Sequence, residues 1–363
     1  MLSSSVPADA FTLPAVLRSC AGLPLSGVGQ AVHCFSIKTG LHSNLYVASA
    51  LVFLYVRLRQ LLNARHVFDE IPVRDAVLWT AMLSGYAQSG DPDSALRILN
   101  EMVGERIELD DVVMVSLLLS CGQLGWLRHG KSVHGFSVRR CYGLVLSLGN
   151  ALIDLYVKCG DFGYAEKLFV RMRERDVISW TALILGHGLN GRADVSFKLF
   201  EEMRRERIEP NSVTFLGVLS ASAHAGMVEK ALGYFYMMNE FGVERELKHY
   251  ACLVDALARA GMLEEAERLA EEMPVEPDRA VFGAILAGCR VHGNAQVAGR
   301  VTKRLLSMHP EKSGYYMNIA NIYADMGRYG DAERVRDFML QKNVGKLPGF
   351  SSIELDYSQS TPN

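Results

Sequence analysis

The sequence lacks an excess of charge of either sign. Its 363 residues include 38 lysine and arginine residues and 40 aspartate and glutamate residues, which gives a formal net charge of −2. Proteins that bind nucleic acid mainly by neutralising phosphates are usually basic, so the charge gives no support for that kind of binding. The longest nearly uncharged apolar runs, 45–56 and 112–121, are shorter than the roughly 18–20 residues that cross a bilayer. We therefore expect a soluble protein with no membrane partner.

Closely spaced cysteines are also missing. Seven cysteines are scattered along the chain without any C-x-x-C spacing, and their neighbours are mostly apolar. This pattern indicates reduced, mostly buried thiols rather than a disulfide framework. The zinc deaminases need C-x-x-C together with H-x-E, so their combined signature is absent. We expect no metal, no cofactor, no small-molecule substrate and no catalytic residue.

What the chain does contain is a long internal repeat with an offset of 101 residues. The offset places Trp79 on Trp180 and Gly90 on Gly191. It relates three kinds of segment, of 35, 31 and 35 residues: 10–44 with 111–145 and 212–246, 45–75 with 146–176, and 76–110 with 177–211. Self-similarity at such a period is the signature of repeat architectures.

Each segment has the pattern of two helices. In 177–211, apolar residues recur near a period of 3.6 up to about Leu189, Asn190-Gly191 interrupts them, and a second amphipathic stretch continues to about Arg205. Only 11 prolines occur in the chain, which suits long runs of helix. One helix pair cannot bury its apolar face alone, so successive pairs must stack. We predict an all-α solenoid of tandem helix-turn-helix repeats, with the two equivalent tryptophans as packing residues.

The alternating motif lengths resemble the pentatricopeptide repeat (PPR) proteins of plants, and within them the PLS subclass, which alternates long, short and standard motifs. The stretches NALIDLYVKCGDFGYAEKLFVRM and SWTALILGHGLNGRADVSFKLFEEM are close to the family pattern. The resemblance covers the chain from Ala10 to about Leu355. It extends to 279–312 and 313–346, which resemble the two degenerate repeats of the C-terminal E domain in that subclass. It implies a right-handed superhelical solenoid.

The resemblance also divides the chain into parts. The expected parts are the tail of a truncated motif at 1–9, a PLS-type array at 10–278 (10–44, 45–75, 76–110, 111–145, 146–176, 177–211, 212–246, 247–278), an E domain at 279–346, and a short disordered extension at 347–363. No amphipathic, arginine-rich leader precedes the first motif. We therefore expect that upstream repeats and a transit peptide are missing from this sequence.

Family members bind single-stranded organellar RNA with one base per helical repeat. The resemblance implies that the fifth and the last residue of a motif read the base. The short and standard motifs then offer Ser49 with Asp75, Thr80 with Asp110, Asn150 with Asp176, Thr181 with Asn211, and Ala251 with Asp278. The long motifs offer Pro14 with Asn44, Val115 with Val145, and Leu216 with Glu246. The side chains of these last pairs do not form a combination that would recognise a base by hydrogen bonds. We therefore expect the long motifs to act as spacers between the reading motifs.

Hydrogen-bonding chemistry assigns bases to four pairs. A carboxylate accepts from guanine N1–H or uracil N3–H, whereas an asparagine amide can donate to adenine N1. A small hydroxyl at the fifth position leaves room for a purine, and asparagine there suits a pyrimidine. The expected readout is G-like at Ser49/Asp75, G at Thr80/Asp110, U at Asn150/Asp176 and A at Thr181/Asn211. The expected RNA core is therefore roughly G-G-n-U-A from 5′ to 3′.

The second residue of each motif should pack against the bases, because sandwiching side chains stabilise single strands without reading sequence. The resemblance places Phe11, Tyr46, Val77, Ile178 and Val213 at this position, with Val112, Ser147 and Lys248 at the equivalent sites. An alternative stays open for the two aromatic residues, Phe11 and Tyr46, which could equally be ordinary core residues.

PLS members mostly specify sites of cytidine-to-uridine editing. The resemblance therefore implies a site-recognition factor in a mitochondrion or a chloroplast, with the mitochondrion favoured, that recruits editing co-factors and a deaminase in trans. Two alternatives stay open. The same RNA binding could serve transcript stability, splicing or translation. The chain could also be a tetratricopeptide-type protein scaffold, although such arrays keep one period of about 34 residues.

Overall fold

The computed structural model describes residues 9–22, 26–105, 107, 111–139, 145–308, 313–325, 327–342 and 344. Within these ranges all regular structure is helical, which confirms the all-α class. The expected reader Asp110, residues 1–8 of the expected motif tail and the expected extension 347–363 lie outside them. No helix in this part of the chain is both long and apolar enough to cross a membrane. The chain divides into two compact units, 1–186 and 187–363.

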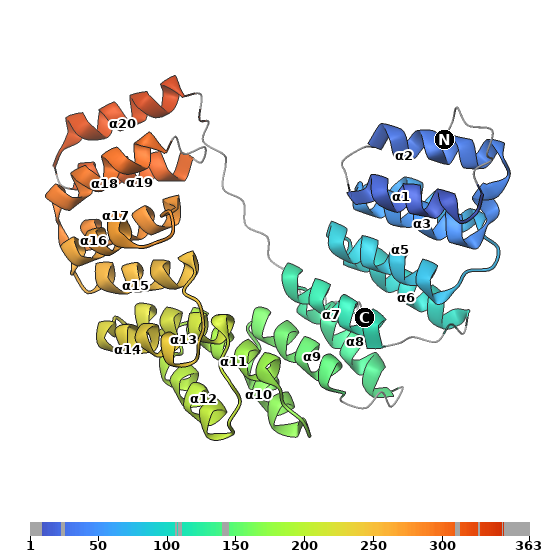
Figure 1. The fold of residues 1–363 in the computed structure, drawn as a ribbon, viewed down its shortest axis with the longest axis horizontal. Coiled ribbons are helices and arrows are strands. Elements are labelled where there is room, and N and C mark those ends of the chain that lie inside the picture. Colours follow the sequence, from blue (N-terminus) through green and yellow to red (C-terminus); the bar gives the residue numbers. More distant parts are fainter. Residues whose placement is uncertain are drawn as a thin grey trace, which may run out of the picture. The chain divides into compact units, whose positions relative to one another are not determined.

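The first unit is a succession of helix pairs (Figure 1). The first helices of its pairs are α1 (Thr12–Gly22), α3 (Leu45–Arg57), α5 (Ala76–Ser89), α7 (Asp111–Leu124) and α9 (Leu146–Lys158). The second helices are α2 (Ser26–Lys38), α4 (Leu61–Glu70), α6 (Pro92–Gly104), α8 (Leu127–Arg139) and α10 (Phe162–Arg171), and a short 3-10 helix, η1 (Leu41–Ser43), follows α2. Helix α11 (Val177–Leu189) contains the division between the units.

The second unit repeats the same arrangement. Its first helices are α13 (Ser212–His224), α15 (Leu247–Arg259), α17 (Arg279–His292) and α19 (Ser313–Asp325). Its second helices are α12 (Ala193–Arg205), α14 (Val228–Glu240), α16 (Leu263–Glu272), α18 (Ala295–Ser307) and α20 (Tyr329–Gln341).

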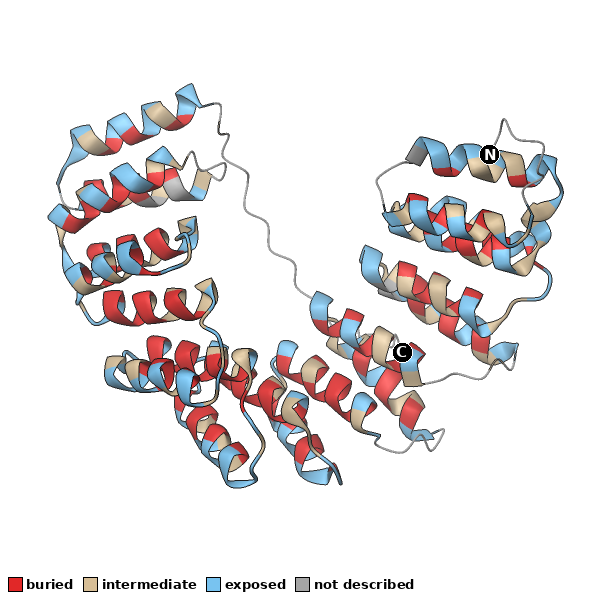
Figure 2. Cartoon of the chain, viewed as in Figure 1, coloured by how far each residue is buried: buried red, intermediate tan, exposed pale blue. Residues whose placement is uncertain are grey.

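The first helices of each unit form a layer of their own. In the first unit α1, α3, α5, α7 and α9 pack in succession, and in the second unit α13, α15, α17 and α19 do the same. Each of these helices also packs against the second helix of its pair. Helices α9, α13 and α15 contain long runs of buried residues (Figure 2). This is expected of helices that have neighbours on several sides.

The offset of 101 residues recurs in the helix boundaries. Helices α3 and α9 begin at Leu45 and Leu146, and α6 and α12 begin at Pro92 and Ala193. The difference in motif length lies in the second helix, since α4, α10 and α16 have 10 residues whereas α6, α12 and α14 have 13. Shortening by nearly one helical turn therefore accounts for most of the difference between short and standard motifs.

The two tryptophans are packing residues, as expected. Trp79 meets Phe68 edge to face, with ring centroids 4.7 Å apart and an interplanar angle of 81°, and Trp180 meets Phe169 with the same values. Both indole rings are fully buried. Aromatic pairs of this geometry contribute about 0.5–1.5 kcal/mol beyond their burial. The repeat seen in the sequence is therefore also a repeat of core packing.

The turn inside a standard motif depends on glycine. Gly90 and Gly191 have φ values of 89° and 73°, in the left-handed region where a Cβ atom is strained. Gly90 caps the C-terminus of α5. Helix α11 ends at Leu189, directly before the expected Asn190-Gly191 break. Local sequence thus fixes where the first helix stops.

Candidate nucleic-acid interface

The last residue of a motif caps the first helix of the next motif. In five motifs the Oδ1 atom of this residue accepts hydrogen bonds of 2.9–3.4 Å from backbone N–H groups in the first helical turn. The five residues are Asn44 at α3, Asp75 at α5, Asp176 at α11, Asn211 at α13 and Asp278 at α17. Such a cap satisfies N–H groups that have no helical partner and contributes about 1 kcal/mol.

Capping gives the other polar atom of each side chain a defined character. In the aspartates this atom is Oδ2, an acceptor, and in the asparagines it is the Nδ2 amide, a donor. Across the described residues, none of these five atoms takes part in a hydrogen bond. Val145, which ends a long motif, makes no side-chain cap. The choice between Asp and Asn at a cap is therefore a choice between an acceptor and a donor at the surface.

One expected pair, Asn150 with Asp176, is joined directly. The Nδ2 amide of Asn150 donates to Asp176 Oδ1 at 3.1 Å, although 26 residues separate them in sequence. Burial raises the pKa of the Asp176 carboxyl. Four hydrogen bonds lower this pKa by more than burial raises it, and they come from the Ser179 backbone, the Asn150 amide, the Ser179 hydroxyl and the Ile178 backbone. The net result is a pKa below the usual value, so the carboxylate is an acceptor at neutral pH.

The other expected pairs fall into three cases. Thr80 is half-buried and donates its hydroxyl to the carbonyl of Ala76 at 2.6 Å, while its expected partner Asp110 is not among the described residues. Thr181 belongs to the first unit and Asn211 to the second. In the described part of the chain, no hydrogen bond links Ser49 to Asp75, Pro14 to Asn44, or Ala251 to Asp278.

The second residue of each motif lies at the surface. Phe11 and Tyr46 expose 83% and 68% of their area, so the alternative that these two are core residues is wrong. Val77, Ile178 and Val213 are exposed as well. Exposed apolar side chains therefore lie at or directly before the start of α1, α3, α5, α11 and α13.

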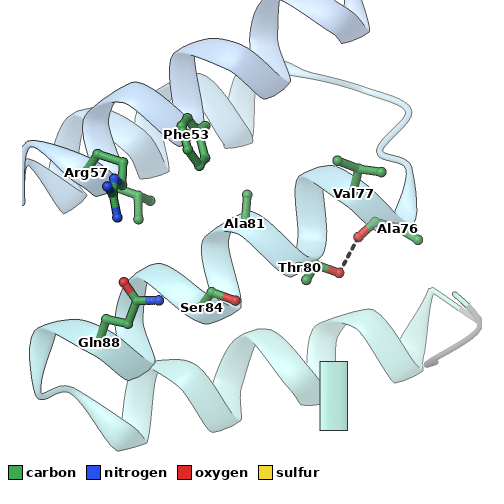
Figure 3. Close-up of a pocket in the computed structure, with 9 residues that line it drawn as sticks. Phe53, Arg57, Ala76, Val77, Thr80, Ala81, Ser84 and Gln88 are labelled. Atoms are coloured by element: carbon green, nitrogen blue, oxygen red, sulfur yellow. Dashed lines mark hydrogen bonds between the residues drawn. The ribbon is translucent and has the colours of Figure 1, made fainter. Parts of the chain in front are cut away.

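Two of the expected contact residues line one cavity between α3 and α5 (Figure 3). Its volume is about 470 Å³, and Val77 and Thr80, the second and fifth residues of a standard motif, both contribute to its wall. Figure 3 shows Thr80 with Val77 toward one end and Arg57 with Gln88 toward the other. The remaining lining residues are Phe53, Val56, Ala76, Ala81 and Ser84. The cavity thus combines apolar walls with a few polar groups, which is typical of ligand sites.

A second cavity, between α17 and α19, differs in its chemistry. It has a volume of about 590 Å³, and the second and fifth residues of its repeat are Ala280 and Gly283. Neither side chain can hydrogen-bond to a base. Its charged groups, Arg290 and Asp325, form an ion pair of 2.8 Å with each other. The fifth residue of this repeat, Gly283, therefore offers no hydrogen-bonding side chain to a base.

Sequence reasoning missed the role of the third residue of a motif. The hydroxyls of Thr12 and Thr214 donate to the Oδ1 atom of the capping residue three positions earlier, at 2.7 and 3.0 Å, and the Ser179 hydroxyl lies 3.0 Å from the equivalent Oδ1 atom of Asp176. In Ser179 and Thr214 the hydroxyl oxygen also accepts from the backbone N–H of that capping residue, at 3.2 Å in both. The signal was present in the sequence as Asp or Asn followed three residues later by Ser or Thr, the spacing of a reciprocal cap.

One stretch, 125–132 (GWLRHGKS), matches the phosphate-binding P-loop pattern. A functional P-loop joins a strand to a helix and places its backbone N–H groups around a phosphate. Here the stretch joins two helices, and the N–H of Gly130 donates to the carbonyl of Trp126 within the first turn of α8. Lys131 forms an ion pair with Asp161 at 3.2 Å. The match therefore does not form a phosphate site.

The remaining chemistry-bearing residues form no cluster. Residues 309–311 (His-Pro-Glu) match the H-x-E half of the deaminase signature, but they lie outside the described residues and no C-x-x-C accompanies them. No group of three metal-ligating side chains comes together within the described ranges. The six cysteines in those ranges are free thiols; Cys34 is exposed, whereas Cys20, Cys121 and Cys289 are buried.

Three family models match the chain. The model described as PPR repeat matches 77–107, 150–177, 213–243 and 249–276, the PPR repeat family model matches 175–224, and the E motif model matches 292–354. A pentatricopeptide repeat-containing protein of Arabidopsis thaliana is 53% identical over 350 residues, which cover 96% of this chain and 73% of the relative.

Other relatives from Arabidopsis thaliana are longer. A mitochondrial pentatricopeptide repeat-containing protein is 37% identical over 98% of this chain and 52% of its own length. The chloroplastic pentatricopeptide repeat-containing protein CRR2 is 36% identical over 96% of this chain and 54% of its own length. The chain thus spans about half the length of these two relatives.

Among solved structures, the pentatricopeptide repeat protein PPR10 from maize has the same fold, with a TM-score of 0.69 and 17% identity over 96% of this chain and 56% of PPR10. PPR10 has also been solved in complex with an 18-nt psaJ RNA element. The repeat models, the E motif and the 53% identical relative together show that this chain belongs to the plant pentatricopeptide repeat family, in its PLS subclass with an E motif.

Proposed function

We propose that the chain binds single-stranded RNA along the layer of first helices and reads one base with each short or standard motif. The helix cap is the observation that carries this proposal. At five motif ends one polar atom is used in the cap, and the second keeps a fixed donor or acceptor character. Recognition of one base per repeat needs such a series of defined hydrogen-bonding groups. The RNA complex of PPR10, which has the same fold, supports the same use of the fold here.

The bases follow from the character of the outward atom. Asp176 beside Asn150 offers an acceptor and an amide donor, which together suit uracil. The outward Nδ2 of Asn211 donates to adenine N1, with Thr181 as its partner. Asp75 with Ser49 and Asp110 with Thr80 supply carboxylate acceptors for guanine N1–H. Ala251 with Asp278 supplies a further acceptor, and the long motifs, including Pro14 with Asn44, act as spacers. The proposed core is G-G-n-U-A.

The exposed second residues sandwich the bases in this proposal. Phe11, Tyr46, Val77, Ile178 and Val213 offer apolar surface at the starts of first helices. The cavity beside Val77 and Thr80 has room for a flat ring against the valine and a polar edge near the hydroxyl. Stacking of this kind stabilises any base, so the discrimination comes from the fifth and last residues.

In the cell, the chain would act as a site-recognition factor for cytidine-to-uridine editing in a mitochondrion or a chloroplast. Residues 10–278 would form the reading array, and 279–346 would form a docking region for editing co-factors and a deaminase supplied in trans. The E motif at 292–354 and the mitochondrial and chloroplastic relatives support this role. The chain itself would be non-catalytic, without a metal or cofactor.

A role in transcript stability, splicing or translation uses the same RNA binding and is the second candidate. The only support for this second candidate is that the chain belongs to the pentatricopeptide repeat family. The tetratricopeptide scaffold is not retained, because the repeat models place the chain in the pentatricopeptide repeat family. The two RNA roles differ in their consequence for one cytidine, which is either edited or left unchanged.

Binding to short RNAs tests the reading function. Fluorescence anisotropy at about 0.15 M salt would compare an RNA that contains G-G-n-U-A with one in which U and A are exchanged. We expect the exchange to weaken binding at least about tenfold, because each unsatisfied polar edge costs about 1–3 kcal/mol. Equal affinity for both RNAs would refute the reading function.

Sequencing of organellar cDNA tests the cellular role. In plants that lack this protein, we expect one or a few cytidines to stay unedited, each a few nucleotides downstream of a G-G-n-U-A core. Normal editing together with altered transcript abundance or splicing would contradict the editing role and favour the second candidate.

A further inference from the structure

Ser179 is the third residue of the motif 177–211 and lies in the first turn of α11, fully buried. Its hydroxyl oxygen accepts from the backbone N–H of Asp176 at 3.2 Å. Its single proton has two acceptors within reach, Asn150 Oδ1 at 2.5 Å and Asp176 Oδ1 at 3.0 Å. The contact with Asn150 is the shorter of the two and lies within the range of roughly 2.5–3.0 Å for O–H···O hydrogen bonds, so we assign the proton to Asn150. Ser179 thus contacts both members of the preceding reading pair.

The contact with Ser179 determines how the Asn150 amide is oriented. The Oδ1 atom of Asn150 receives the Ser179 hydroxyl, and the Nδ2 atom faces the Asp176 carboxylate at 3.1 Å. Both contacts select the same one of the two amide orientations. The second N–H of Nδ2 is engaged by neither contact, so it remains as a donor beside the free Oδ2 atom of Asp176.

We infer that Ser179 is a positioning residue that sets the base preference of the Asn150/Asp176 site, an inference that rests on the proposed RNA-reading function. With the amide held in place, the site presents a donor and an acceptor, which suit a uracil carbonyl and N3–H. With the amide reversed, it presents two acceptors, which suit the adjacent N1–H and N2–H₂ donors of guanine. Loss of the Ser179 hydroxyl removes one of the two contacts that hold the amide in the uracil orientation and leaves only the contact with Asp176, so the preference for uracil over guanine falls.

The matched position in the earlier motif offers no such contact. There Asp75 is followed three residues later by Leu78, whose side chain has no hydrogen-bonding group and is fully buried. Thr214 does carry a hydroxyl, and it donates to the capping Asn211 at 3.0 Å. The variant T214V thus removes a capping hydroxyl of the same kind in a different motif, which makes it the matched control.

The test uses four RNAs that differ only at the nucleotide opposite motif 146–176, within the core G-G-n-N-A. For the wild-type protein we expect uracil to be bound about tenfold more tightly than guanine. In S179A this ratio should fall to about twofold or less. S179T should restore it, because threonine makes the equivalent cap contact at positions 12 and 214. T214V should keep the wild-type ratio at this nucleotide.

A double-mutant cycle separates positioning from stability. If Ser179 acts through Asn150, its removal should leave the uracil-to-guanine ratio unchanged in the N150A background. A weaker cap alone would reduce the affinity for all four RNAs equally and leave the S179A ratio at the wild-type value, which would refute this inference. Wild-type protein that binds the four RNAs equally would refute the proposed reading function, and this inference with it.

Discussion

Asn150 donates a 3.1 Å hydrogen bond to Asp176, the residue that ends its own motif and caps the next helix. The contact joins two positions 26 residues apart and leaves Oδ2 of the carboxylate without a hydrogen bond among the described residues. A helix cap and the proposed base-reading group therefore share one side chain. This sharing allows the acceptor to be changed to a donor without loss of the cap.

The variant Asp176→Asn is expected to change the base preference at this site. Asn211 caps α13 with Oδ1, so asparagine at 176 should keep the cap and turn Nδ2 outward. Cytosine N3 accepts a hydrogen bond whereas uracil N3–H donates one, so the ratio of affinities for C and U should rise at least about tenfold. Anisotropy with RNAs that differ at this nucleotide measures the ratio.

The control for Asp176→Asn is Glu174→Gln, which changes the net charge equally at an exposed neighbouring position. It should leave the preference between C and U unchanged. Equal weakening of all RNAs by Asp176→Asn would contradict the assignment of Asp176 as a reader.

The variant Gly186→Ala is expected to destabilise the first unit by about 1–3 kcal/mol. A Cβ atom at this buried glycine of α11 would overlap Cγ1 of Val157, and overpacking of a well-filled core costs free energy in this range. Val157→Ala in the same chain should recover part of the loss. Denaturant unfolding followed by circular dichroism measures both effects.

Gly163→Ala is the matched control for Gly186→Ala. Gly163 is exposed in α10 with open space around its Cβ position, so alanine there should leave stability unchanged or raise it by up to about 1 kcal/mol. The packing explanation fails if the two alanine variants have the same effect.

The variant Arg59→Gly is expected to raise the free energy of unfolding by about 0.5–1 kcal/mol. Arg59 has a φ of 57°, a backbone conformation that costs a residue with a side chain about 1–2 kcal/mol. Glycine removes this strain, but its greater conformational freedom in the unfolded chain offsets part of the gain in stability. The residue 101 positions later is Gly160, with a φ of 80°. Thermal unfolding should show no comparable gain for Arg59→Ala. A gain of the same size for alanine would rule out backbone strain as the cause.

The stability of the protein is expected to fall with acid because of buried histidine. Burial lowers the pKa of His134, whose Nδ1 lies 2.9 Å from the Tyr156 hydroxyl. The unfolded chain therefore takes up this proton at higher pH than the folded chain. The contribution of neutral His134 is complete above about pH 6.5 and is lost as the pH falls toward the folded pKa, at about 1.4 kcal/mol for each unit of lowering.

The measurement for His134 is the dependence of Tm on pH between about 7.5 and 5.5. His134→Gln should lower the slope, whatever its effect on Tm at a single pH. His66→Gln, which changes an exposed histidine, should follow the wild-type slope. An unchanged slope in His134→Gln would exclude this histidine as the source of acid sensitivity.

Much of the fold could be predicted from local sequence. The end of α11 at Leu189 and the span of α12 to Arg205 follow from apolar periodicity and an Asn-Gly break, which act within a few residues. The caps can be predicted from local sequence for the same reason, since the side chain of an Asp or Asn directly before a helix bonds only to the first turn of that helix. The repeat offset of 101 residues then predicted that the same packing would occur twice, as in the pairs of Trp79 with Phe68 and Trp180 with Phe169.

The candidate site was only partly predictable. The proposed positions of the readers came from the family pattern, but the sequence left Phe11 and Tyr46 equally suited to core and surface, and the structure exposes both. The role of Ser179 was overlooked, because its contact with Asn150 crosses 29 residues. The stretch 125–132 shows the opposite kind of failure, because it matches the P-loop pattern in sequence but lies at a junction between two helices and forms no phosphate site.

The sequence by itself determined the helix pairs, their caps and their repeat, because these depend on interactions within one or two helical turns. Only the tertiary structure decided which side chains face outward and which ones touch across motifs. Those outcomes depend on how successive helix pairs stack, and the stacking is set by the fit of many buried side chains from neighbouring pairs. The contact of Asn150 with Asp176 and Ser179 exists because that stacking brings the start of α11 beside α9.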